Sequence, residues 1–280
     1  MQITVKPKKT NAITLVNPTP HLQTPQVGEF IRSLIAERQR LGRHRLWGSI
    51  STAGGHLFIK TTHLSSLISR LRVTFGLRRR SGALDWPIAE LRNSLKVNRL
   101  TALTPQLLGY SHIRGRFGLI NEVVLIIEDQ TGFLNGAQWL DRYSSALPQL
   151  LPRLIDCILE LNSQNIYHLD LWLGNFMLSD SPTPTIKVID FENCFLRQTL
   201  FSAETLGYQL GLLFEFKLHA YIDEANYDQL VHTKLIKFPG LDQKKFVEFY
   251  EYFKRHGAGR KERYFIPQQG QLITGKPTRG

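Results

Sequence analysis

Apolar positions divide the chain into a strand-rich first half and a helix-rich second half. Residues 56–60 follow the glycine pair Gly54 and Gly55, and this pattern predicts a β-hairpin. The apolar, partly β-branched run at residues 122–127 predicts a buried strand that ends at the acidic residues Glu128 and Asp129. We therefore expect the first half of the chain to form a small lobe rich in β-strands.

Helical spacing appears in two places. Residues 88–103 predict a helix that ends before Pro105. Residues 147–161 carry leucine and isoleucine at intervals of three and four, which predicts an amphipathic helix with one buried face. The order of elements favours an α+β fold, with a small β-rich N-terminal lobe containing one helix, joined by a hinge to a larger helical C-terminal lobe.

Composition suggests an arm at each end of these lobes. Residues 1–27 are rich in lysine and proline and predict a loosely docked N-terminal arm. The predicted lobes cover residues 28–128 and 129–256. Residues 257–280 are again rich in Gly, Pro and basic residues, so we expect a partly mobile tail whose apolar cluster at residues 264–266 could dock.

Charge and hydropathy narrow the class of protein. A net charge of +12 favours an anionic partner, either nucleic acid, lipid headgroups or a phosphorylated substrate. The absence of an RNA-binding motif with interleaved aromatic residues argues against nucleic acid. No apolar run approaches the roughly 18 residues that span a bilayer, and the N-terminus lacks a secretory pattern. We expect a cytoplasmic protein, and the spacing of its two cysteines predicts neither a disulfide framework nor a zinc site.

Two motifs carry the candidate chemistry. His168, Asp170 and Asn175 follow the predicted helix in the order H-x-D-x-x-x-x-N, and Asp190 begins the sequence Asp-Phe-Glu after a second strand-like run. This pattern resembles the catalytic loop and metal-binding segment of protein-kinase-like enzymes. The resemblance implies the bilobal protein-kinase-like fold. It also implies an ATP-dependent kinase.

The chemistry of phosphoryl transfer explains the residue types. Asp170 is the candidate catalytic base, because an acceptor hydroxyl needs a carboxylate nearby to take its proton. Asn175 and Asp190 offer the oxygen ligands that Mg²⁺ prefers. His168 is assigned a structural role within the loop. The alternative is that these residues are a helix cap, a turn residue, an acid at a strand end and a core histidine. All four would then have to occur by chance at the spacing found in kinases.

The motifs also depart from the protein-kinase pattern. Leu169 stands where protein kinases usually carry the arginine that pairs with an activation-loop phosphate, so we do not expect regulation by phosphorylation. Glu192 stands where protein kinases carry glycine.

Upstream residues complete the candidate nucleotide site. Lys60 ends an apolar strand and matches the lysine that binds ATP phosphates, and Glu90 is its expected partner on the next helix. No glycine-rich G-x-G-x-x-G loop is present, so Ser51 and Thr52 are the candidates for covering the phosphates. Glu128 is expected near adenine at the hinge. A solvated lysine on a strand edge and a solvated glutamate on a helix face remain the alternatives.

The region from Lys60 to Asp190 is similar to the lipopolysaccharide core kinases, which act on Kdo or heptose of the bacterial inner core. The similar stretches are the basic segment with Pro-Ile-Ala-Glu and Leu-Leu-Gly-Tyr within residues 78–110, VVLIIEDQTG, HLDLWLGNF and IDFEN. This resemblance implies ATP and Mg²⁺, a core glycolipid substrate and a cytoplasmic enzyme with peripheral contact to the anionic inner membrane. It leaves the sugar, its hydroxyl and the oligomeric state open.

Features of the residues themselves also limit the substrate. Glu204 follows Asp190 by only 14 positions, which is too short for the segment that docks a peptide in protein kinases. A basic cluster suits a phosphorylated glycolipid or a membrane surface, although a solvated basic loop is an equal alternative; it comprises Arg70, Arg72, Arg78, Arg79 and Arg80. A small-molecule kinase of the aminoglycoside or choline type and a pseudokinase binding module are the competing interpretations.

Overall fold

The computed structural model describes residues 14–15, 24–79, 84–115, 117–236, 240–259 and 262–272. The protein is of the α+β class, and its chain divides into two compact units. The first unit comprises Met1–Asn98 and Pro105–Thr131, and the second comprises Arg99–Thr104 and Gly132–Gly280. The expected lobe boundary after residue 128 lies close to this division, but the sequence did not indicate that Arg99–Thr104 belongs to the second unit.

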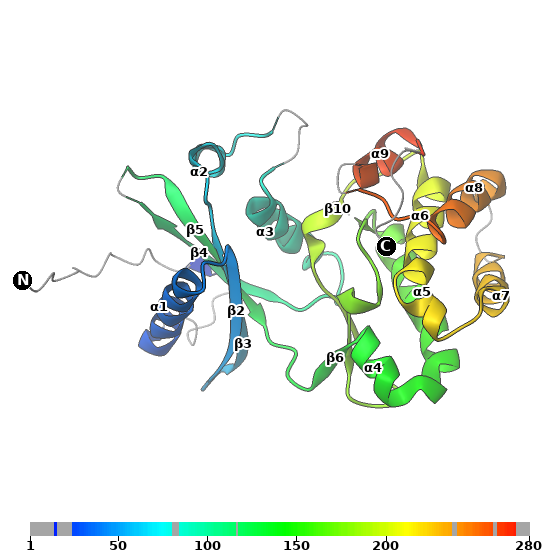
Figure 1. The fold of residues 1–280 in the computed structure, drawn as a ribbon, viewed down its shortest axis with the longest axis horizontal. Helices are drawn as coiled ribbons and strands as arrows, with labels where there is room; N and C mark the ends of the chain where they lie inside the picture. Colours follow the sequence, from blue (N-terminus) through cyan, green and yellow to red (C-terminus); the bar gives the residue numbers. More distant parts are fainter. Residues whose placement is uncertain are drawn as a thin grey trace, which may run out of the picture. The chain divides into compact units, whose positions relative to one another are not determined.

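The first unit is built on one antiparallel sheet with the strand order β1-β4-β5-β3-β2 (Figure 1). The strands are β1 (Thr14–Leu15), β2 (Arg45–Thr52), β3 (Gly55–His63), β4 (Leu107–Arg114) and β5 (Ile120–Glu128). The predicted hairpin is present, since β2 and β3 pair from Thr52 and Gly55 outward and Gly55 takes a positive φ of 126°. The predicted buried strand corresponds to β5.

Both faces of this sheet are covered. Leu57 and Ile59 of β3 pack with α1 (Pro25–Arg40) on one face. Val123 and Leu125 of β5 pack on the other face with α2 (Leu67–Phe75) and α3 (Trp86–Val97). Because side chains alternate along a strand, Lys60 lies on the α3 face, opposite Leu125 in the ladder.

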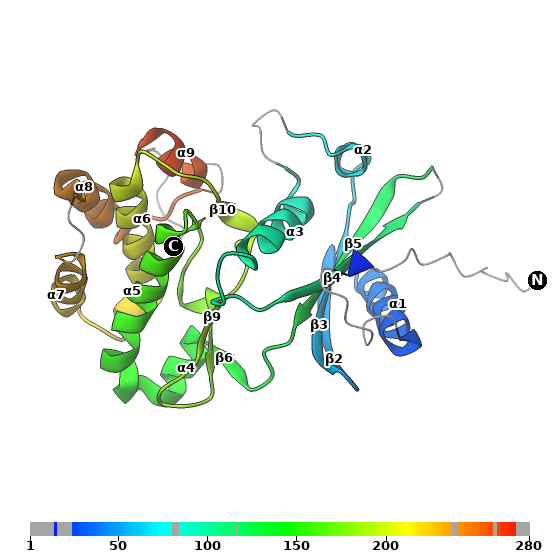
Figure 2. The ribbon, with the colours of Figure 1, turned by 180° about the vertical axis from the view of Figure 1, so that it is seen from behind.

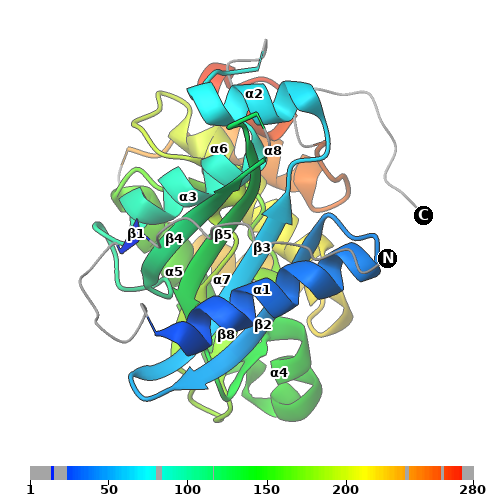
Figure 3. The same cartoon turned by 90° about the vertical axis from the view of Figure 1, so that its left-hand side faces the viewer.

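Helix α1 is an element that the sequence interpretation missed. Thr24 caps it by accepting a hydrogen bond from the Val27 amide, Pro25 occupies the first turn, and Val27, Ile31 and Leu34 are buried on one face. The helix lies across β2 and β3 (Figure 3). The end of the predicted arm at residue 27 therefore falls inside a helix. Most of residues 1–27 lie outside the described part of the chain.

A buried ion pair connects α1 to the sheet. Arg38 Nη2 lies 2.6 Å from Glu122 Oε1, and His63 Nδ1 lies 2.9 Å from the same oxygen. Burial raises the pKa of Glu122, although the charges of Arg38 and His63 act in the opposite direction.

The prediction of a single helix in the N-terminal lobe is wrong, because α1, α2 and α3 all occur among the described residues of the first unit. Helix α3 also ends at Val97 rather than at residue 103. Asn98 turns the chain there, since its side chain accepts from the Leu107 amide at 2.6 Å and donates to the Pro105 carbonyl at 3.0 Å.

The second unit is mainly helical and surrounds α5 (Leu147–Ser163), the helix that the leucine spacing predicts. Two small antiparallel sheets accompany the helices, with strand orders β6-β8-β9 and β10-β7 (Figure 2). The remaining elements are β6 (Phe133–Asn135), α4 (Gly136–Tyr143), η2 (Ser144–Ala146), β7 (Tyr167–His168), η3 (Leu173–Asn175), β8 (Phe176–Ser179), β9 (Ile186–Val188), η4 (Phe191–Asn193), β10 (Cys194–Phe195), α6 (Ser202–Glu215), η5 (Leu218–Ala220), α7 (Glu224–Leu235), α8 (Gln243–Phe253) and α9 (Glu262–Gln269).

Part of the predicted C-terminal tail is a docked helix. Ile266 of α9 is buried in a cluster that also contains Leu169, Tyr208 and Phe249. The expectation that residues 264–266 could dock is therefore confirmed, while residues 273–280 lie outside the described part. Within the described ranges no helix has the length and apolarity needed to span a membrane.

Helices α6 and α8 approach each other closely because α6 carries glycine at two positions one turn apart. A Cβ added at Gly207 would lie 2.5 Å from the Phe246 carbonyl oxygen, and one at Gly211 would lie 2.8 Å from the Tyr250 carbonyl oxygen. Such contacts are with backbone, which cannot move as a side-chain end can. The packing of the second unit therefore depends on these two glycines.

Gly207→Ala should lower the free energy of unfolding by about 1–3 kcal/mol, because the added methyl forces α6 away from α8. Gly28→Ala is the matched control in α1, where the new Cβ meets only the end of Arg32 at 3.7 Å. The control should be neutral or stabilise by up to about 1 kcal/mol, through the helix propensity of alanine. Denaturant titration of both variants measures the difference, and equal stabilities would contradict the packing argument.

Candidate active site

His168 fixes the start of the candidate catalytic loop, residues 168–175. It ends β7, which pairs with β10 so that His168 lies opposite Cys194, and its side chain is fully buried. Nε2 lies 3.0 Å from the Ile189 carbonyl oxygen, and Nδ1 accepts the Asp170 amide at 3.2 Å. These contacts require the neutral tautomer with its proton on Nε2. Burial lowers the pKa of His168, although the bond to Ile189 and the charges of Asp190 and Asp170 oppose this shift.

The carboxylate of Asp170 is held at both oxygens. Arg263 Nη1 lies 2.5 Å from Oδ1, and Asn193 Nδ2 donates to Oδ2 at 3.2 Å. The Asp170 side chain is 24% exposed, so a bound molecule can reach its carboxylate. A carboxylate has about four acceptor positions, and two donors leave capacity for about two more hydrogen bonds.

Asn175 closes the loop from its other end. Its Nδ2 donates to the Asp170 carbonyl at 2.7 Å, and its own carbonyl accepts the Ile189 amide at 3.0 Å. With the nitrogen used in this way, the amide oxygen Oδ1 is the atom that could bind a cation. Asn175 therefore links Asp170 to the strand that leads to Asp190.

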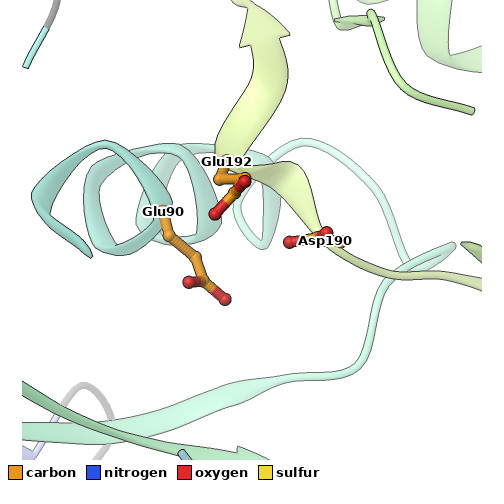
Figure 4. Close-up of side chains that lie close together, drawn as sticks. All are labelled: Glu90, Asp190 and Glu192. Atoms are coloured by element: carbon orange, nitrogen blue, oxygen red, sulfur yellow. The ribbon is translucent and has the colours of Figure 1, made fainter. Parts of the chain in front are cut away.

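Asp190 takes an unusual backbone conformation at the end of that strand. Its backbone is left-handed, with φ 66° and ψ 53°, a region in which non-glycine residues other than Asn and Asp are uncommon. Its Oδ1 is buried and has no hydrogen-bond partner among the described residues. A carboxylate oxygen of Glu192 lies within 4.8 Å of one from Asp190, and both side chains appear on the turn after β9 in Figure 4.

These donors fit a hard divalent cation. An orphaned buried carboxylate oxygen is costly unless a ligand satisfies it, and Mg²⁺ prefers carboxylate and amide oxygens. Asp190 and Asn175 are the residues that would hold the ion, and Glu192 is a further donor in reach of Asp190.

Lys60 and Glu90 meet within the first unit. Lys60 Nζ lies 2.7 Å from Glu90 Oε1, and the two side chains are only 15% and 6% exposed. Glu90 projects from α3 (Figure 4), and this helix covers the face of the sheet on which Lys60 lies. A solvated edge lysine and a solvated helix glutamate do not describe these residues, because both are largely buried.

The two hydroxyls expected to cover phosphates have partners within the β2–β3 hairpin. Ser51 Oγ lies 2.9 Å from His56 Nδ1, and Thr52 Oγ1 donates to the Gly55 carbonyl at 2.9 Å. The Glu128 carboxylate likewise accepts the Gln106 amide at 3.2 Å. These three residues stabilise the ends of strands in the first unit, and a nucleotide role for them stays a prediction.

Two arginines of the basic cluster are structural. Asp85, which is buried, binds Arg72 through Nε at 2.6 Å and Arg79 through Nη2 at 2.6 Å. Burial opposes ionisation of Asp85, but the hydrogen bonds from the two arginines outweigh it and lower its pKa. Arg70 donates to the Leu64 carbonyl, and Arg80 lies outside the described residues. Arg72 and Arg79 are therefore held by Asp85, and a role of the cluster in binding an anionic partner stays a prediction.

Three residues around Asp170 and Asp190 were not among the predicted site residues: Asn193, Glu192 and Arg263. Asn193 lies three positions after Asp190, and its contact with Asp170 follows from the pairing of β10 with β7. Glu192 appeared only as a departure from the kinase pattern. Arg263 had no local signal, because it lies in the basic tail and reaches Asp170 only through the docking of α9.

A comparison with solved structures includes one protein that is distantly similar over most of this chain. The structure resembles that of WaaP in complex with acyl carrier protein, with 15% sequence identity, 75% of this chain and 83% of that chain covered, and a TM-score of 0.45. No family model and no curated protein sequence matches the chain. The chemistry of the residues is therefore the basis for a functional proposal.

Asp190→Asn should stabilise the metal-free protein by about 1 kcal/mol, because it replaces a partly buried carboxylate charge, one oxygen of which lacks a partner, with a neutral amide and keeps a residue that tolerates the left-handed backbone. Asp180→Asn is the control, since Asp180 is bound by Arg142 and Tyr143. That change should be neutral or slightly destabilising. Thermal unfolding in EDTA compares them, and a less stable Asp190→Asn would show that the carboxylate is satisfied within the fold.

Proposed function

We propose that this chain is an ATP-dependent phosphotransferase with an alcohol as acceptor. One observation carries the proposal. A single hydrogen-bonded network in the second unit joins His168, Asp170, Asn175 and the carbonyl and amide of Ile189, directly before Asp190. This network supports a fixed separation between a candidate base and a candidate cation ligand, which phosphoryl transfer requires.

The residues take the following roles in the reaction. Asp170 accepts the proton of the acceptor hydroxyl as its oxygen bonds to the γ-phosphorus of ATP and the bond to the β-phosphate oxygen breaks, which releases ADP. Asn175 and Asp190 would hold Mg²⁺, which neutralises charge on the phosphates when bound. Lys60, fixed by Glu90, is the proposed phosphate-binding residue.

A non-peptide acceptor is supported by the short segment after the metal-binding turn. Only residues 196–201 separate β10 from α6, and they contain no helix or strand. Six residues provide little surface on which a peptide could dock. Together with the motif resemblance, this supports a sugar hydroxyl of the lipopolysaccharide inner core, on heptose or Kdo, as the acceptor. A small-molecule alcohol of the aminoglycoside or choline type is the alternative.

The proposal includes peripheral contact with an anionic membrane, through the exposed face of α2. Five large apolar side chains on this helix and just after it are 37–65% exposed: Leu67, Ile68, Leu71, Phe75 and Leu77. The stretch of residues 67–80 has five arginines and no acidic residue, and Asp85 offsets only one of these charges. Apolar side chains beside net positive charge favour an anionic lipid surface.

Asp170→Asn should keep Mg-ATP affinity and lose phosphoryl transfer by about 10²–10⁴-fold, since it removes the base and retains the shape. Transfer of labelled γ-phosphate to purified inner-core glycolipid measures the rate, and calorimetry measures nucleotide binding. Asp141→Asn is the control, because Asp141 binds Tyr221 at 2.7 Å, outside the catalytic loop. Its rate should match that of the wild-type protein.

The outcomes separate the alternatives. A wild-type rate for Asp170→Asn would contradict the assigned base. A wild-type protein that phosphorylates a small alcohol or an aminoglycoside, but no core sugar, would favour the small-molecule alternative. Nucleotide binding without any transfer would favour the pseudokinase interpretation.

Replacing both Ile68 and Phe75 with Glu should weaken binding to phosphatidylglycerol vesicles by at least about tenfold, because each buried apolar side chain contributes about 1.5–3 kcal/mol. The control is the double variant Leu200→Glu with Ile236→Glu, which makes the same charge change at exposed positions of the second unit. Vesicle co-sedimentation measures both. Equal binding of the two variants would show that charge alone drives association, or that α2 does not contact lipid.

A further inference from the structure

Arg263 contacts the candidate base from a distant part of the sequence. It lies on α9, 93 positions after Asp170, and its Nη1 is 2.5 Å from Asp170 Oδ1. The Arg263 side chain is 14% exposed, and its Nε donates to the Ala258 carbonyl at 3.1 Å. The guanidinium is therefore fixed by its own chain segment while it binds the carboxylate.

The loop itself has no cation to perform this function. The residue directly before Asp170 is Leu169, which is fully buried beside Tyr208 and Ile266. The Tyr208 hydroxyl donates to the Leu169 carbonyl at 2.6 Å, so this position is committed to the core. A positively charged side chain that pairs with the Asp170 carboxylate must therefore come from another element. Arg263 of α9 is such a side chain.

Helix α9 is held firmly against the second unit by buried side chains and hydrogen bonds. Ile266 and Pro267 are buried, Thr199 Oγ1 donates to the Pro267 carbonyl at 2.5 Å, and the Tyr264 hydroxyl donates to the Glu192 carbonyl at 3.3 Å. Its contacts are with the core and with the turn that carries Glu192. Undocking of α9 would expose apolar surface to water, which is unfavourable. Arg263 is therefore a fixed part of the folded second unit.

We infer that Arg263 is a positioning residue for Asp170. Together with Asn193, it holds both carboxylate oxygens and fixes one orientation of the base, and the remaining acceptor capacity is left for the substrate hydroxyl. The inference rests on the proposed phosphotransferase function, and it predicts that the C-terminal helix is required for catalysis although it contains none of the kinase motifs.

Arg263→Met should lower kcat by about 10²-fold and leave KM for ATP within about twofold, because it acts on the base and not on the nucleotide. Arg263→Lys should recover part of the loss, since it keeps the charge but not the guanidinium geometry. Arg255→Met is the matched control, because Arg255 is paired with Glu251 and Glu224 on the surface of the same unit. Its kinetics should be unchanged.

A double-mutant cycle gives a readout that a merely structural role would not produce. In the Asp170→Asn background, Arg263→Met should cause no further loss of kcat, since the residue acts through Asp170. A further loss of similar size would overturn the inference and assign Arg263 a contact with substrate. Thermal unfolding of each variant is measured in parallel, and a kcat loss explained by unfolded protein alone would also overturn it.

The inference and the proposed function fail in different ways. A wild-type protein that transfers no phosphate to any alcohol refutes the function, and the inference falls with it. An active wild-type protein whose Arg263→Met variant keeps its kcat refutes the inference alone.

Discussion

The hydrogen bond from His168 Nε2 to the Ile189 carbonyl is the contact on which the candidate catalytic loop depends. It joins the start of the loop to the strand that delivers Asp190. The same imidazole accepts the Asp170 amide, so both ring nitrogens are used and the ring must be neutral. A buried charged imidazole would lose one of these bonds and incur a desolvation cost. The distance between candidate base and cation ligand is therefore set by a residue that takes no part in the chemistry.

The structure of the loop could be predicted because its signals are local. Thirteen residues beginning at Ile166 contain His168, Asp170 and Asn175, and the helix before them has clear leucine spacing. Lys60 and Glu90 were also within reach, since an apolar strand and an amphipathic helix place them on facing surfaces. Each of these predictions used spacing within one element or between neighbouring elements.

The remaining features depend on contacts that spacing does not encode. Arg263 looks like one basic residue in a polar tail until α9 is docked on the core. Ser51 and Thr52 have suitable chemistry for phosphate, but the hairpin geometry provides partners for their hydroxyls five and three residues away. Helix α1 did have a readable apolar stripe, at Val27, Ile31 and Leu34, and was missed because it follows a proline-rich segment. The net charge of the basic segment also does not indicate that the buried Asp85 binds both Arg72 and Arg79.

The left-handed backbone at position 190 restricts which amino acids can replace aspartate there during evolution. Glycine, asparagine and aspartate are the residues that adopt this conformation readily, and only aspartate supplies an anionic oxygen there. Codons for asparagine and glycine are each one nucleotide away from those for aspartate. If no cation had to be bound at this site, a single nucleotide change would be enough to replace the unpaired carboxylate with asparagine or glycine. Aspartate at this position therefore combines a backbone conformation that few residues adopt with a buried carboxylate oxygen that has no partner among the described residues.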